Sequence, residues 1–356
     1  MKDRKPKDPQ CKLVDIGGQA VMEGVMMKAP DAIAVAVRRP DQTIVVDRKT
    51  YDAPSKKHKW MGWPFVRGII NMGTMLSLGM TTLQQSTSML GMLDEEPSKF
   101  ELWLSKKLGK GIDKIVMGVA VVLAIALSVV LFFAIPEGFA RWLKGVWADS
   151  SMNWLVNLLS GILRILILIG YIWVCMLVPD VRRTFQYHGA EHKTVYCHEN
   201  KQPLTPENAR VYSTLHPRCG TSFLLLVFVI SIVLFTAVGY QGNVYIYRLL
   251  SRLALLPVVA GVSYEVLKLL AHSDSALSRA LRWPGIQLQR LTTKKPDDGM
   301  LEIAIVAMNV ALHGMPRYAE RTPEGWAVLK SYRESDPDYV PEPAEAPTPE
   351  AEKAAV

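Results

Sequence analysis

The chain has 356 residues, of which 49% are hydrophobic and 21% charged, and its formal net charge is +8. Four cysteines in so long a chain exclude a small disulfide-stapled scaffold. The positive mean hydropathy, +0.13, indicates that the apolar residues are gathered in blocks. A net positive charge is consistent with binding to nucleic acid, with binding to an anionic membrane surface, or with basic loops retained in the cytoplasm. The composition does not distinguish these three explanations, so we turn to the positions of the basic and apolar residues along the chain.

The N-terminal part combines a charged start with a β-type sequence. Residues 1–12 are rich in lysine and lead into no apolar segment, so we do not expect a cleavable signal peptide. Further on, the β-branched runs Ile33–Val37 and Thr43–Val46 are separated by turn-forming residues, which predicts a β-hairpin. We therefore expect a small cytoplasmic β region over residues 13–55.

The region 60–112 contains a stretch, 68–93, that carries no charge but many hydroxyl, amide and glycine residues. It is long enough to cross a bilayer but too polar to be assigned as a span. We expect a helix that lies at the membrane interface or packs against other helices, and a re-entrant segment remains an alternative.

Four segments farther along indicate a mainly α, polytopic membrane protein. About 20 apolar residues cross the hydrocarbon core of a bilayer. Three of the segments meet that requirement clearly, and the fourth is weaker because it contains proline and charged residues. The expected spans are 115–135, 154–178, 221–240 and 253–270, within a transmembrane domain over 113–272. The second span contains Arg164, whose long side chain we expect to reach the interface.

An even number of spans, here four, places both termini on the same side of the membrane. The distribution of basic residues indicates which side this is. The connection 179–220 is rich in lysine and arginine, whereas the connections on the other face carry few. We therefore expect a multi-pass cell-membrane protein with both termini and the loop 179–220 in the cytoplasm. A C-terminal region, 273–334, contains the apolar stretch Leu301–Leu312, which predicts a docked helix, and the tail 335–356 predicts disorder.

The loop 179–220 gathers four of the seven histidines and two of the four cysteines. In a thiol-reducing compartment such clustering indicates a metal site rather than a disulfide. His188 and His192 lie one helical turn apart, and with Glu191 they form the inverted zincin string His-x-x-Glu-His. In that pattern two histidines bind zinc and the glutamate acts as the catalytic base.

The remaining metal ligand is open. Glu265 is an ionisable residue in an expected span, which favours a functional role, whereas His216 and Cys219 are nearer in sequence. A thiolate disfavours magnesium and calcium, so zinc is the expected ion. Two alternatives remain: a closed structural site made of Cys197, His216, Cys219 and one histidine, and a simple pairing of Glu265 with Lys268.

Other signals are weaker. Glu23 lies between Gly18 and Gly24 and serves either a site or a turn beside a strand. The basic residues are scattered and form no basic-aromatic module, so we expect no nucleic-acid partner. The lipid bilayer is the expected partner, and membrane-protein partners or a homo-oligomer remain open.

Four blocks of sequence resemble the signature blocks of the YqhQ-like family of uncharacterised bacterial membrane proteins, catalogued as predicted metal-dependent enzymes. The blocks are Gly17–Met27, Tyr187–Thr194, Leu215–Ser222 and Leu291–Thr293. The resemblance covers roughly residues 13–312. It implies membrane residence, metal chemistry and a site made of His188, Glu191, His192, His216 and Cys219, and it implies no substrate.

The leading prediction is thus an integral membrane protein with a divalent-metal site, expected to hold zinc, at its cytoplasmic face. It would act as a metal-dependent hydrolase in which Glu191 is the base. The alternative is a non-enzymatic membrane scaffold or assembly factor with a structural metal. Ion transport is less favoured because the ligands crowd the loop and the spans carry few charges.

Overall fold

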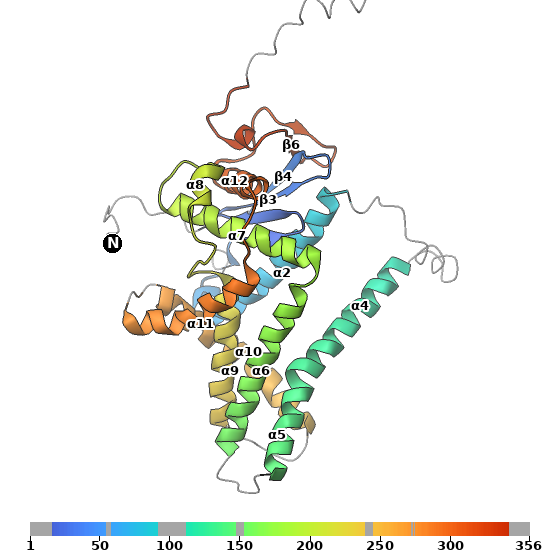
Figure 1. Ribbon diagram of the computed structural model, residues 1–356, viewed down its shortest axis with the longest axis vertical. Coiled ribbons are helices and arrows are strands. Elements are labelled where there is room, and N and C mark those ends of the chain that lie inside the picture. Colours follow the sequence, from blue (N-terminus) through green and yellow to red (C-terminus); the bar gives the residue numbers. More distant parts are fainter. Residues whose placement is uncertain are drawn as a thin grey trace, which may run out of the picture.

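A computed structural model describes the chain in seven stretches. These are residues 16–54, 58–91, 112–146, 153–238, 245–271, 273 and 275–341. The molecule is mainly helical, with a β-sheet and its covering helices at one end and a group of apolar helices that extends away from them (Figure 1). The predicted charged start, residues 1–12, the stretch 92–111 and the tail beyond residue 341 lie outside the described residues.

The sheet has six antiparallel strands in the order β1-β2-β3-β4-β6-β5. The strands are β1 Gly17–Val21, β2 Gly24–Lys28, β3 Ala32–Arg38, β4 Ile44–Thr50, β5 Glu320–Arg321 and β6 Ala327–Leu329. The predicted hairpin is confirmed as β3 and β4, with Val37 opposite Val45. The N-terminal β region is completed by β6, whose Leu329 lies opposite Ile44.

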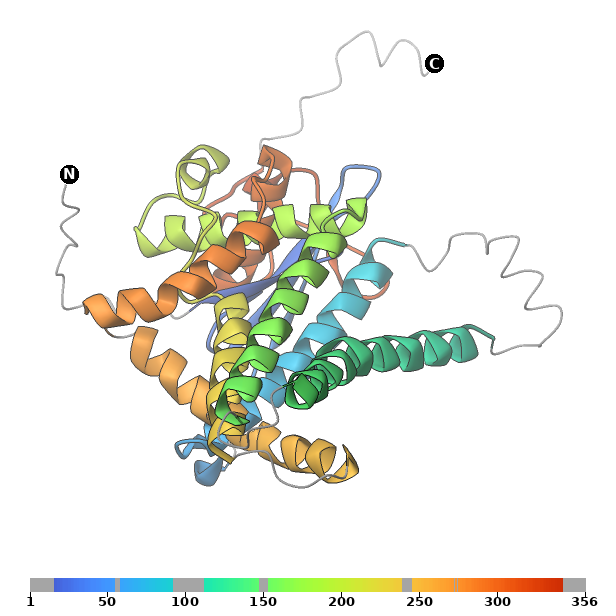
Figure 2. The ribbon, with the colours of Figure 1, turned by 60° about the horizontal axis from the view of Figure 1, so that its bottom comes forward.

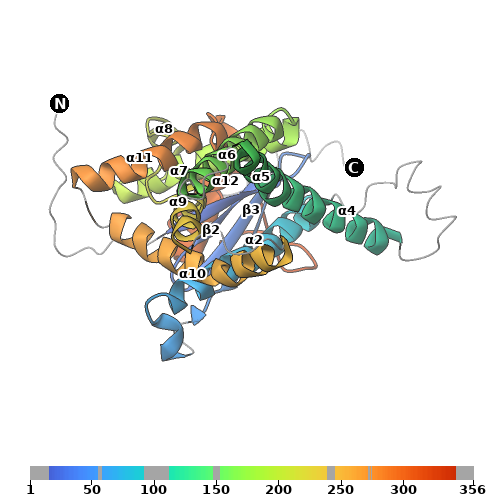
Figure 3. The same ribbon diagram turned by 90° about the horizontal axis from the view of Figure 1, so that it is seen from below.

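Strand β3 shows why the sheet is buried on both faces. Its sequence alternates alanine with a larger residue, and alternate side chains of a strand point to opposite faces. Ile33, Val35 and Val37 belong to the hydrophobic cluster that contains the end of helix α2. Ala34 and Ala36 belong to the main core with helices α7 and α12, so small side chains let those helices approach closely. Figure 3 shows the sheet between α2 and α12.

The helices follow in chain order. They are η1 Lys59–Gly62, α2 Val66–Met89, α4 Ile112–Val129, the π-helix η3 Val130–Ala134, α5 Ile135–Val146, α6 Asn153–Cys175, α7 Pro179–Glu199, α8 Pro206–Arg210, α9 Gly220–Val238, α10 Tyr245–Ala271, α11 Ala276–Thr292, α12 Asp298–His313 and η5 Tyr332–Ser335. Helix α12 is the predicted docked helix over Leu301–Leu312, and most of its side chains are buried. The stretch 68–93 lies mostly in α2, which packs on the sheet and on α10.

Three helical stretches are long and apolar enough to cross a membrane. They are Gly118–Val146, Asn153–Cys175 and Leu250–Leu270. The expected span 221–240 coincides with α9, whose apolar part, Phe223–Ala237, is shorter than this length. Of the three, Gly118–Val146 stands apart from the other helices along much of its length (Figure 2).

Three helical regions differ from, or add to, what the sequence predicts. The helix of the first span does not end at Pro136 but continues into α5; the π-helix η3 directly before it widens the backbone, and this relieves the clash of a proline ring with the preceding turn. The connection 179–220 consists largely of α7 and α8, and α7 has the helical spacing of His188 and His192 that the sequence predicted. Helix α11 was not expected at all, because its proline and its polar residues obscure its helical pattern.

Candidate metal centre

The four sequence blocks meet where the sheet joins the apolar helices. Block one forms β1 and β2, which pack against α7, and α7 contains block two. Block three leads into the start of α9, and block four lies at the end of α11, which packs against α9. Four segments that are far apart in sequence therefore surround one place in the fold.

Three side chains at this place are close enough to hold one ion. His188, His192 and Cys219 each offer a ligand atom, and these atoms lie within 4.8 Å of one another. His188 Nε2 is 3.2 Å from Cys219 Sγ. The bond lengths of tetrahedral zinc put a nitrogen and a sulfur ligand about 3.5 Å apart. The spacing therefore fits the donors of a single zinc-sized ion.

Hydrogen bonds fix the tautomer of both histidines. His188 Nδ1 donates to the carbonyl oxygen of Thr292 at 2.9 Å, and His192 Nδ1 donates to that of Thr214. A carbonyl oxygen can only accept, so the proton of each neutral ring is on Nδ1 and the Nε2 lone pair is free. His192 Nε2 is buried and makes no hydrogen bond in the described structure. Both rings therefore present a ligand atom to the same point.

Glu191 lies beside these ligand atoms. Its side chain is 7% exposed, and Oε2 is 3.4 Å from His192 Nε2 and 4.0 Å from His188 Nε2. The stem of Glu191 crosses β1 at Gly18, where an added Cβ would lie only 2.6 Å from Glu191 Cγ. The glycine of the first block thus makes room for the carboxylate of the second.

His216 is the neighbour of His192, with ring centroids 5.7 Å apart, but its ring has the opposite polarity. The backbone N–H of Arg218 donates to His216 Nδ1 at 3.3 Å, so the proton of the neutral ring is on Nε2, 3.3 Å from Glu199 Oε1. Burial lowers the pKa of His216, although the charge of Glu191 opposes this, so the ring is neutral near pH 7. His216 therefore offers a hydrogen-bond donor rather than a metal ligand.

Residues that the sequence analysis did not single out hold this arrangement in place. Gln289 of α11 is fully buried; its Oε1 accepts from the backbone N–H of His216 and its Nε2 donates to the His216 carbonyl, both at 2.8 Å. Lys193 donates to the carbonyl oxygens of Arg210 and Tyr212. A buried glutamine looks like an exposed one in a sequence, so Gln289 gave no signal.

The structure does not bring the other candidates to this place. Glu265 of α10 binds the guanidinium of Arg67, whose Nε is 2.7 Å from Glu265 Oε1. The Sγ of Cys197 bonds to backbone carbonyl oxygens, that of Pro203 at 3.4 Å among them, inside the main core. The closed site that would need Cys197 is therefore not assembled.

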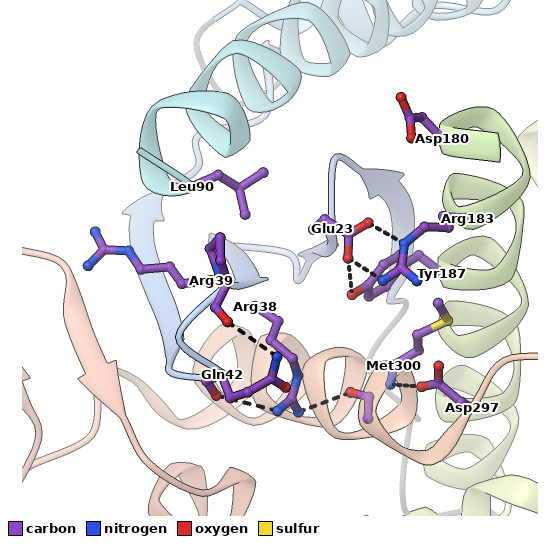
Figure 4. Close-up of a pocket in the computed structure, with 12 residues that line it drawn as sticks. Glu23, Arg38, Arg39, Gln42, Leu90, Asp180, Arg183, Tyr187, Asp297 and Met300 are labelled. Atoms are coloured by element: carbon purple, nitrogen blue, oxygen red, sulfur yellow. Dashed lines mark hydrogen bonds and ion pairs between the residues drawn. The ribbon is translucent and has the colours of Figure 1, made fainter. Parts of the chain in front are cut away.

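Glu23 lies in a separate cavity of about 530 Å³. It occupies the turn between β1 and β2 with a left-handed φ of 46°, which is strained for a residue other than glycine. Its carboxylate accepts two hydrogen bonds of 2.5 Å from Arg183 and one of 3.2 Å from Tyr187, as Figure 4 shows. Glu23 raises the pKa of Arg183, mainly by these hydrogen bonds. The cavity lining includes none of the candidate metal ligands. The hydrogen bonds from Arg183 and Tyr187 to Glu23 instead fasten the β1–β2 hairpin to α7.

These features define a class of protein: a β-sheet with covering helices, joined to apolar helices, with a histidine–cysteine cluster at the junction. Residues 63–314 match the model of a family described as "Protein of unknown function (DUF1385)". The chain is 33% identical over 299 residues to "Uncharacterized protein YqhQ" of Bacillus subtilis (strain 168), covering 83% of this chain and 92% of that protein. The chain therefore belongs to this YqhQ-like family, as the four blocks predicted, and no solved structure matches it.

Proposed function

We propose that this protein is an integral membrane enzyme that uses a divalent metal, zinc by its ligand set, to hydrolyse a substrate at the cytoplasmic face of the membrane. The observation that carries the proposal is the convergence of His188, His192 and Cys219 within 4.8 Å, with the Glu191 carboxylate 3.4 Å from His192 Nε2. Soft thiolate and imidazole donors suit zinc better than magnesium or calcium.

Membrane residence is supported by the helices that lead away from the site. Three helical stretches have the length and hydropathy of membrane spans, and many of their large apolar side chains are exposed in the isolated chain. Exposed apolar helices of this length are stable in lipid and not in water. The basic residues near the sheet favour the cytoplasm for that end, and this supports a metal centre that faces the cytoplasm next to the inner membrane surface.

The residues around the site divide the chemistry among them. A divalent ion held there would supply a Lewis acid and lower the pKa of a coordinated water. Glu191, buried beside the ligand atoms, is placed to accept a proton from an attacking water. His216, with its proton on Nε2 and Glu199 next to it, is placed to donate a hydrogen bond to the negative charge that develops on the substrate.

An open site favours catalysis over a structural metal. Structural zinc sites have four protein ligands, whereas catalytic sites have three and an open position. The described residues provide three, and Cys197 and His216, which the closed site would need, are committed to other hydrogen bonds. A scaffold with a structural metal is therefore the second candidate.

The test distinguishes the loss of the catalytic base from the loss of a metal ligand. We expect Glu191→Gln to keep the abundance and metal content of the wild type but to lose its products, because only proton transfer is removed. His188→Ala should lose both metal and products. The measurement is mass spectrometry of lipids and peptides in cells that lack their own homologue and express each variant. Glu207→Gln, an exposed change on α8, is the matched control.

Two outcomes are decisive. A Glu191→Gln variant whose product profile equals that of the wild type would contradict hydrolysis with Glu191 as base. If, in addition, Cys219→Ser lowered the abundance of the protein, the scaffold with a structural metal would replace the enzyme.

A further inference from the structure

Helix α11 carries a stripe of leucines that is buried at one end of the helix and exposed at the other. Leu277, Leu281, Leu288 and Leu291 follow one another at intervals of four, seven and three residues, so they share one face of the helix. Leu288 is buried and Leu291 is half-buried. Leu277 and Leu281, in contrast, are 69% and 54% exposed. The apolar face is therefore packed in the C-terminal half of α11 and exposed in the N-terminal half.

The packed half of the stripe shows which way this face points. Leu288 and Leu291 belong to the hydrophobic cluster that contains Leu168 and Ile172 of α6 and Leu225 of α9. Helix α6 is one of the stretches long and apolar enough to cross a membrane, and the apolar part of α9 includes Leu225. The stripe thus faces the apolar helices, and its exposed half continues along the same face beyond them.

Helix α11 lies at the level where these apolar helices end. Ile172 is three residues before the end of α6, and Leu225 is five residues after the start of α9. Helix α10, which contains another candidate span, ends at Ala271, and α11 begins at Ala276. Figures 1 and 3 show α11 running crosswise to α6 and α9. In a membrane crossed by the spans, a helix in this place runs along the surface.

The remaining side chains of α11 suit the boundary between lipid and water. Trp283 is 62% exposed to the side of the leucine stripe, and Arg290 is exposed on the opposite side of the helix. Tryptophan is enriched at membrane interfaces, and basic residues are attracted by anionic headgroups. Amphipathic helices with this division of residues lie in the plane of a membrane, with their apolar face at the boundary of headgroups and acyl chains.

We propose that the N-terminal half of α11 inserts into the phospholipid at the membrane surface next to the sheet, with Leu277 and Leu281 among the acyl chains. The phospholipid that surrounds the spans then also covers the exposed half of the stripe. This inference rests on the membrane residence in the proposed function, but not on the metal or the reaction.

The insertion of α11 connects the membrane surface with the metal centre. At the other end of the helix, the carbonyl oxygen of Thr292 accepts the hydrogen bond from His188 Nδ1. Gln289 makes two hydrogen bonds to the backbone of His216. A helix anchored in lipid at its N-terminal half therefore holds the metal centre at the height of the phospholipid headgroups.

The experiment places a photo-reactive benzophenone amino acid at single positions of the full-length protein, in membranes of the cells that express it. After irradiation, mass spectrometry of the purified protein measures covalently attached phospholipid. Leu281 and Leu277 are the test positions. Val122, 64% exposed in the stretch Gly118–Val146, is the positive control, and Glu207, exposed on α8, is the negative control. We expect as much adduct at both test positions as at Val122, and several times the amount at Glu207.

The controls separate this proposal from membrane residence itself. Adducts at Val122 but not at Leu281 and Leu277 would overturn the proposal and leave the spans in the membrane. Cross-links from the test positions to a protein chain in place of phospholipid, or equal adducts at Leu281 and Glu207, would also overturn it. Absence of phospholipid adducts at Val122 as well would contradict membrane residence, and the proposal would fall with it.

Discussion

For each histidine of the site, the hydrogen bond at Nδ1 determines whether Nε2 is a free metal ligand or a hydrogen-bond donor. His188 and His192 donate from Nδ1 to carbonyl oxygens and keep Nε2 for a metal. His216 accepts at Nδ1 from the backbone of Arg218 and so presents Nε2–H. The four-residue spacing in the sequence predicted the first pair. It could not predict the polarity of His216, which depends on the local backbone geometry between His216 and Arg218.

The contact between Gly18 and Glu191 predicts that adding a methyl group at position 18 lowers the stability of the protein. In Gly18→Ala the new Cβ would lie 2.6 Å from Glu191 Cγ and 2.7 Å from the Met26 carbonyl oxygen, so the strand or the carboxylate has to move. We expect a loss of about 1–3 kcal/mol in unfolding free energy. Gly17→Ala is the matched control, because nothing lies within 4 Å of its added Cβ. Equal stabilities of the two variants in denaturant titration would show that this contact is absent.

His198 near the end of α7 gives a pH prediction. Burial, and to a smaller extent repulsion from His313, lowers the pKa of His198 below its ordinary 6.5. The unfolded chain therefore binds a proton more readily than the folded one, so this contribution to stability is complete above pH 6.5 and is lost as the pH falls below it. We expect Tm to fall less between pH 7.5 and pH 5.5 in His198→Gln than in the wild type. An identical fall in both proteins would contradict this assignment.

At the scale of elements, α7 serves two neighbours at once. Arg183, Tyr187 and Glu191, four residues apart, face the β1–β2 hairpin, while His188 and His192 face the ends of α9 and α11. The hairpin, the docked helix and the helical histidine pair were predictable because each depends on local periodicity. The pairing of β4 with β6 was not, since it joins strands almost 280 residues apart and no local pattern encodes the partner.

That long-range pairing gives a test by truncation. Removing the chain from residue 316 onward deletes β5 and β6, uncovers the edge of β4 and removes Leu329, which is fully buried. We expect a loss of at least about 3 kcal/mol in stability and a strong tendency to aggregate. Size-exclusion chromatography in detergent measures the aggregation. A truncation from residue 342, beyond the described residues, should behave as the full chain, and a monodisperse protein cut at 316 would contradict a structural role for β6.

At the scale of the whole molecule, two polar groups of residues lie at opposite ends of a set of apolar helices. The metal centre is at the junction with the sheet, and the ion pair of Glu137 with Arg252 is at the remote end. Arg164, whose side chain we expected to reach the interface, is instead 7% exposed and packed between helices. The sequence alone left the basic composition of the chain ambiguous. Under the proposed function, the basic residues near the sheet are the ones that would face the cytoplasm.

The metal content of the purified protein tests the metal centre most directly. The full chain is purified in detergent, equilibrated with zinc, dialysed and analysed by inductively coupled plasma mass spectrometry beside His188→Ala and Cys219→Ser. We expect about one equivalent of zinc in the wild type and a large loss in both variants, because each removes one of three ligands. A folded wild type that retains no divalent metal, or variants that retain as much as the wild type, would contradict a metal site at His188, His192 and Cys219.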